Sequence, residues 1–64
     1  MNTIEAAQQA VLNITGGTIT FAFKSRNWQR YEIGSIGEDG VKREFHVALD
    51  ADLTDPCDGP SQVA

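Results

Sequence analysis

The stretch from Val41 to Leu49, VKREFHVAL, has apolar residues at positions 41, 45, 47 and 49, separated by polar or small residues. A period of two is typical of a β-strand with one buried face. The turn sequence GEDG at residues 37–40 comes directly before it. We therefore expect residues 41–49 to form the second arm of a β-hairpin.

The hydrophobic pattern also predicts the register of this hairpin. A three-residue loop closed by a left-handed Gly40 sets Ile33 opposite Phe45, apolar against apolar. A slip by one residue would set Ile33 opposite Glu44 instead. The favoured register places Tyr31 opposite Val47 and Glu32 opposite His46.

Residues 2–13 are predicted to form a helix. Ile4, Ala7, Val11 and Ile14 recur at spacings of three and four, which puts them on one helical face. We expect Asn2 to cap the start, with Glu5 reaching back as a capping box. Gly16-Gly17 should end the helix, because glycine accepts the left-handed conformation common there.

Two further strands are predicted before the hairpin turn, over residues 18–24 and 28–36, with a bulge favoured by Gly34 and Gly37. The predicted fold class is α+β: one N-terminal helix packed on a three-stranded antiparallel meander (α-β-β-β) with an acidic C-terminal tail. The expected core is Ile4, Ala7, Val11, Ile14, Ile19, Phe21, Phe23, Tyr31, Ile33, Phe45, Val47 and Leu49.

The charge distribution predicts one domain over residues 1–51 and an acidic flexible tail over residues 52–64. Residues 1–49 hold five acidic and five basic side chains, so this part is near neutral. The net charge of −4 comes from the last fifteen residues, which have no base. Their composition of Asp, Pro, Gly and Ser is typical of a flexible segment.

The composition also predicts the location of the chain and excludes two kinds of stabilising site. No basic leader with an apolar run and no membrane-length apolar stretch is present, so a cytoplasmic location without membrane contact is expected. One cysteine and one histidine exclude an intramolecular disulfide and a Cys/His zinc cage. Because a 64-residue core is small, a binding partner or a homodimer is expected to support it.

Trp28 and Arg30 are the first candidate partner-binding residues. On an uncovered sheet face, Trp28 could anchor an interface with Arg30 beside it. Alternatively, Trp28 could fold over the hairpin end and cap the core. A basic-aromatic platform for nucleic acid is disfavoured, because the bases are balanced by acids and the tail adds negative charge.

Neither catalysis nor cofactor binding is expected. His46 opposite Glu32 could be a general base held by a carboxylate, or an ordinary cross-strand pair with no nucleophile beside it. Asp50-x-Asp52 lacks the glycine and closing glutamate of a calcium loop, so no metal is expected. Cys57 lies between Asp55 and Asp58, which makes it a poor nucleophile and a bystander thiol.

The acidic residues give a second candidate surface. Carboxylates two or three residues apart in an extended chain lie roughly 7–10 Å apart, comparable with alternate phosphates of a nucleic acid. They could therefore mimic a phosphate backbone on a basic surface, or serve as a solubilising terminus. The residues concerned are Asp50, Asp52, Asp55 and Asp58, with Glu38 and Asp39 at the hairpin tip as a second acidic point.

As a whole, the chain resembles the small acidic inhibitor proteins that phages carry against host defence, anti-CRISPR proteins in particular. The resemblance covers the full length and is one of type: very short, acidic, helix plus meander, without a catalytic set. It implies a non-enzymatic inhibitor that binds a host nucleic-acid-processing protein or effector complex in the host cytoplasm. The alternative is a structural or accessory module that homodimerises through its sheet.

Overall fold

The β2–β3 hairpin has the register predicted from its hydrophobic pattern. In a computed structural model that describes residues 2–55 and 57–63, β2 (Arg30–Ile36) pairs antiparallel with β3 (Lys42–Ala48). Ile33 lies opposite Phe45 and Glu32 opposite His46. Gly40, with φ of 78°, supplies the left-handed residue of the turn.

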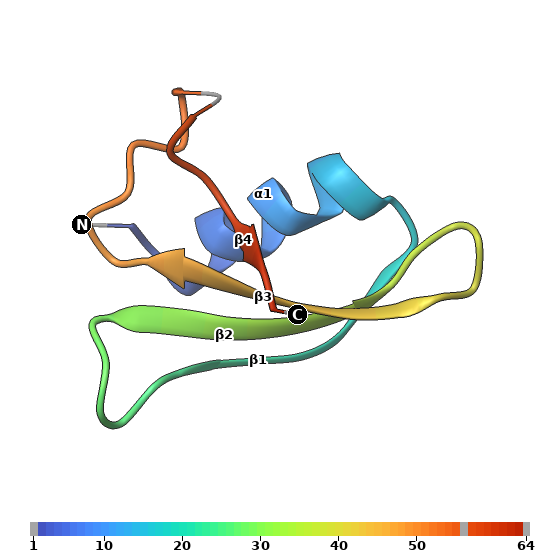
Figure 1. Cartoon of the computed structure of the whole chain (residues 1–64), viewed down its shortest axis with the longest axis horizontal. Helices are drawn as coiled ribbons and strands as arrows, with labels where there is room; N and C mark the ends of the chain where they lie inside the picture. Colours follow the sequence, from blue (N-terminus) through green and yellow to red (C-terminus); the bar gives the residue numbers. More distant parts are fainter. Residues whose placement is uncertain (1, 56, 64) are drawn as a thin grey trace.

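The predicted α-β-β-β order is confirmed. Helix α1 (Ile4–Thr15) comes first, followed by β1 (Thr18–Lys24), β2 and β3 in one antiparallel sheet. Figure 1 shows α1 on one side of the sheet, so that one face is covered and the other is open. Between α1 and the sheet lies the core cluster, formed by Ala7, Val11, Ile33, Phe45 and Val47.

The start of α1 differs from the prediction. The cap is Thr3, in an extended conformation, and its Oγ1 accepts a hydrogen bond from the Ala6 N–H at 3.1 Å. The prediction of an Asn2 cap with a Glu5 capping box is therefore wrong. Asn2 instead donates its backbone N–H to the Leu49 carbonyl and its Nδ2 to the Ala51 carbonyl, both at 2.7 Å. These bonds fasten the N-terminal segment to the chain just after β3.

The main correction concerns β1, which has the predicted bounds but a different facing. Its register with β2 shifts between Ile19 and Phe21, so Thr20 is an extra, bulged residue. The extra residue reverses the inward and outward alternation beyond it. Ala22 therefore packs against the core cluster, opposite Ile33. Phe21 and Phe23 point to the open face and are 37% and 49% exposed, so their assignment to the core is wrong.

Ile14 is a second error in the predicted core. It lies in the last turn of α1 and is 59% exposed. The core gains instead from the segment after β3, where Ala51 is buried and Leu53 packs against the cluster. The row of buried residues on α1 was therefore predicted to extend one turn too far toward the C-terminus.

The C-terminal segment returns to the sheet. Strand β4 (Ser61–Gln62) pairs antiparallel with β3, and the Val63 N–H donates to the Glu44 carbonyl at 2.8 Å. Within the described residues, the sheet therefore has four strands in the order β1-β2-β3-β4. The predicted tail, residues 52–64, thus contributes a pairing with β3 and, through Leu53, a contact with the core cluster.

The cap predicts a specific loss of stability. Thr3→Ala should lower the free energy of unfolding by about 1 kcal/mol, because the Ala6 N–H loses its acceptor. Thr3→Ser keeps the hydroxyl and should remain close to the parent protein. Chemical denaturation followed by circular dichroism measures both, and equal stability of all three proteins would contradict this assignment of the cap.

Candidate functional site

The open side of the sheet is the most distinctive surface of the molecule, and we call it the outer face. Strand register defines it: side chains opposite one another across an antiparallel pair share a face. One row runs through Phe21, Gly34 and Glu44, and the next through Phe23, Glu32 and His46. The outer face includes Thr18, Phe21, Phe23, Arg30, Glu32, Ile36, Lys42, Glu44, His46, Ala48, Ser61 and Val63.

Aromatic side chains are concentrated on this face and at its edge. The Phe21 and Phe23 rings stack with centroids 5.7 Å apart and planes inclined by 28°. The Phe21 ring lies directly over Gly34, where any Cβ atom would overlap it. Gly34 is therefore needed for the ring to lie flat on the sheet.

Trp28 and Arg30 form a second pair at one end of the sheet. Trp28, in the loop before β2, is 60% exposed, so it is not buried as a cap on the core. The Arg30 guanidinium carbon lies 5.2 Å from the ring centroid, within the range of a cation–π contact. Arg30 has no ion pair among the described residues.

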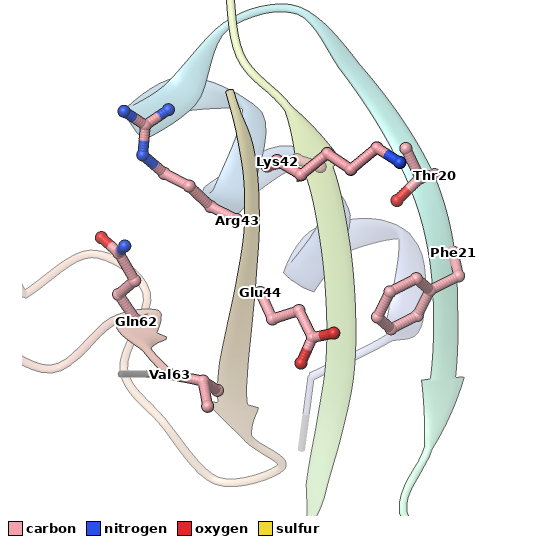
Figure 2. A pocket seen from close by; sticks show the side chains of 8 residues that line it. Thr20, Phe21, Lys42, Arg43, Glu44, Gln62 and Val63 are labelled. Atoms are coloured by element: carbon pink, nitrogen blue, oxygen red, sulfur yellow. The ribbon is translucent and has the colours of Figure 1, made fainter. Parts of the chain in front are cut away.

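A shallow hollow of about 320 Å³ adjoins Phe21 toward β4. Figure 2 shows the side chains around it. Lys42 extends across β2 toward Thr20, and Glu44 and Val63 lie on the side of β3 and β4. Within the described part of the chain, Lys42 and Glu44 have no ion-pair partner. The outer face therefore combines aromatic surface with unpaired charges of both signs.

His46 and Glu32 lie together as the register predicted, with Nε2 and Oε1 3.4 Å apart. No nucleophile was predicted beside this pair, but the pairing of β4 with β3 sets Ser61 opposite His46. No hydrogen bond joins Ser61 to His46 in the part of the chain that the structure describes. The geometry is that of a cross-strand pair on a polar part of the outer face.

The acidic residues of the C-terminal segment form a folded loop, not an extended row. We call residues 50–55 with 57 and 58 the acidic loop. Backbone turns join Asp55 N–H to the Asp52 carbonyl and Asp58 N–H to the Asp55 carbonyl, both at 3.0 Å. The prediction of extended carboxylates at phosphate-like spacing is therefore wrong, because aspartates in this composition favour turns over an extended backbone.

Most carboxylates of the acidic loop hold its own backbone. Asp52 Oδ1 accepts hydrogen bonds from the N–H and hydroxyl of Thr54, and these bonds lower the pKa of Asp52. Asp58 Oδ2 accepts from the Asp52 N–H and Asp55 Oδ1 from the Cys57 N–H, both at 2.9 Å. Asp50 is exposed and takes no part in this hydrogen bonding.

The hairpin tip lies away from the acidic loop. Figure 1 shows the β2–β3 turn at one end of the sheet and the loop after β3 at the other. At the tip, Asp39 accepts two hydrogen bonds from the Arg43 guanidinium, at 3.2 and 2.9 Å. This contact, together with a hydrogen bond from the Val41 N–H, lowers the pKa of Asp39 to about 2. Arg43 therefore offsets the charge of Asp39, and the Glu38 side chain lies against Gly16.

Trp28 and the acidic loop, in contrast, lie at the same end of the sheet. The Leu49 N–H donates to the Gln29 carbonyl at 3.1 Å, which joins the residue after Trp28 to the residue before Asp50. Of the residues predicted to bind a partner, Trp28, Arg30 and the acidic loop thus lie at one end of the sheet, with Glu38 and Asp39 at the other. The loop lies on the α1 side, where Asp55 lines a hollow with Ile14. Phe21 and Phe23, which were predicted in the core, lie on the outer face because of the bulge.

Comparison with known proteins adds no relative. No protein-family model, curated protein or solved structure matches the chain. Among residues 2–55 and 57–63, no helix is long and apolar enough to cross a membrane. The same residues contain no group of three or more His, Cys, Asp or Glu side chains arranged to hold a metal ion.

The Asp39–Arg43 contact gives a prediction about pH. Arg43→Met keeps the aliphatic stem but removes both donors, so the pKa of Asp39 should rise from about 2 toward its ordinary value of 3.8. Because the folded-state pKa is lowered, the stabilisation from this pair is present above the ordinary pKa and is lost as the pH falls through about 2. Carboxyl chemical shifts measured by NMR during an acid titration report both values. An unchanged Asp39 titration in Arg43→Met would show that the pair does not form.

Proposed function

We propose that the protein is a non-enzymatic, protein-binding inhibitor that contacts its partner through the aromatic part of the outer face. The observation that carries this proposal is the exposure of Phe21, Phe23 and Trp28 on or beside one open sheet face. Contiguous exposed apolar groups mark interaction sites. Tryptophan and arginine are enriched among the residues that dominate binding energy. Trp28 with Arg30 stacked on it supplies both.

The charge of the molecule favours a partner with a basic surface. The net charge is −4, and the acidic loop lies at the same end of the sheet as Trp28. Acidic groups at that end, on the α1 side of the sheet, would steer a basic partner toward the molecule and disfavour acidic ones. Direct nucleic-acid binding is not proposed, since phosphates would be repelled by the same groups.

Such a partner is a host nucleic-acid-processing protein or effector complex, which must carry a basic surface to hold its substrate. This part of the proposal rests on the resemblance in type to anti-CRISPR proteins and on the acidic loop. The folded loop presents a compact cluster of carboxylates in place of an extended imitation of a phosphate backbone. Inhibition would follow from occupation of the basic surface in competition with DNA, in the host cytoplasm if the protein is phage-encoded.

The aromatic contact can be tested by replacing its exposed residues and comparing them with a control residue that has a similar exposed fraction. After a pull-down from host lysate has identified a partner, Trp28→Ser and Phe23→Ser should each weaken its binding by tenfold or more. Val41→Ser is the control, because Val41 follows the hairpin tip, at the other end of the sheet, and is 48% exposed, against 49% for Phe23. Calorimetry with the purified partner measures the affinities. Wild-type affinity of Trp28→Ser and Phe23→Ser, or an equal loss in Val41→Ser, would refute the proposal.

The electrostatic part has a separate test. Asp50→Asn removes a charge without breaking a hydrogen bond of the acidic loop, so it should weaken binding at low salt and reduce the salt dependence. Glu38→Gln removes one charge from the hairpin tip, at the other end of the sheet, and serves as the control. If the two variants change the salt dependence equally, only net charge matters and the acidic loop is not part of the interface.

A further inference from the structure

Strand β1 is the longer free edge of the sheet. The order β1-β2-β3-β4 leaves β1 paired on one side only, while the opposite edge is the two-residue β4. An unpaired edge presents free N–H and carbonyl groups to another strand. The sequence of β1, TITFAFK, has no proline, and its one charged residue, Lys24, stands at the end. The bulge at Thr20 and the charge of Lys24 protect the two ends of this edge, so residues 21–23 are the part open to pairing.

We propose that β1 pairs antiparallel with β1 of a second copy of this chain, centred on Ala22, so that one continuous sheet crosses both copies. This inference goes beyond the inhibitor function and does not depend on it. In this pairing Ala22 lies opposite Ala22 of the second copy. On the outer face, the Phe21 of each copy lies opposite the Phe23 of the other. Cross-strand aromatic pairs of this kind stabilise a sheet.

The bulge at Thr20 selects this register. Side chains opposite one another must point to the same face, and the bulge reverses the facing between Ile19 and Phe23. Centring the pair on Phe21 would set inward Ile19 opposite outward Phe23. Centring it on Phe23 would pair Phe23 with its own copy and leave Phe21 opposite Ser25, outside β1. Centring it on Ala22 matches facing over residues 21–23 and pairs every phenylalanine of the two strands with another.

Charge favours the same arrangement. An antiparallel pair centred on Ala22 sets Lys24 opposite Thr20, so the two lysines stand at opposite ends of the new interface. The acidic loop connects β3 to β4, on the side of the sheet away from β1. Contact through β1 therefore holds the two negatively charged loops far apart, where ionic screening removes most of their repulsion. Pairing through β4 would bring them together.

The dimer would also supply what a chain of this size lacks. A 64-residue domain buries a smaller fraction of its surface than larger domains do, about 60%. Among the described residues, the central cluster consists of Ala7, Val11, Ile33, Phe45 and Val47. Joining two β1 strands satisfies the edge groups of both copies and brings four phenylalanine rings together on the outer face. Trp28 and Arg30 lie outside β1 and remain exposed for another partner.

Disulfide trapping tests both the dimer and its register. In a Cys57→Ser background, Ala22→Cys places two thiols on the two-fold axis, with Cα atoms about 4.5–5.5 Å apart, within disulfide reach. Lys24→Cys is the control, because those positions are four residues apart along the paired strands, about 13 Å. Mild oxidation should give a covalent dimer of Ala22→Cys and leave Lys24→Cys monomeric. Equal cross-linking of the two variants would overturn the register.

Sedimentation equilibrium of the unmodified chain gives an independent result should Ala22→Cys fail to fold. A mass that rises from one copy to two with concentration supports the proposal, and a single-copy mass at every concentration overturns it. Trp28→Ser separates this proposal from the inhibitor function. It should keep the dimer while losing the protein partner, whereas loss of the dimer in Trp28→Ser would place the interface on the outer face and not on β1.

Discussion

The β-bulge at Thr20 is the constraint on which the surface of this protein depends. One extra residue in β1 reverses the facing of everything after it, so that Ala22 packs on the core and the neighbouring phenylalanines turn outward. Without the bulge, strict alternation would place Phe21 and Phe23 beneath α1 and leave Ala22 exposed. The bulge thus places two large side chains on the surface and not in the core, although the core of this chain is small.

Several other features are consistent with that exchange. Gly34 provides the bare backbone on which the Phe21 ring lies, and Leu53 and Ala51 add apolar volume to the core from the C-terminal segment. The same segment forms the acidic loop and β4. The chain therefore compensates for its outward aromatics with residues recruited from beyond the meander, and in doing so brings a negatively charged loop to the Trp28 end of the sheet.

The sequence predicted best where one register alone could bury the apolar residues. Only one pairing of β2 with β3 sets Ile33 opposite Phe45, and that hairpin is confirmed. The bulge could not be predicted, because TITFAFK can bury either its phenylalanines or Ile19 with Ala22, and the choice depends on packing against α1. In the C-terminal segment, Leu53 and Val63 were signals of contact with the fold, but the prolines and aspartates around them indicated a flexible tail.

The facing of β1 is tested most directly by nuclear Overhauser contacts from the two phenylalanine rings. The structure predicts contacts between the rings of Phe21 and Phe23, and between the Phe21 ring and the α-protons of Gly34. The methyl groups of Val11, inside the core, should instead be near Ala22. Strong contacts from either ring to the Val11 methyls would place the aromatics beneath α1, and the outer face would then have no stacked phenylalanines to offer a partner.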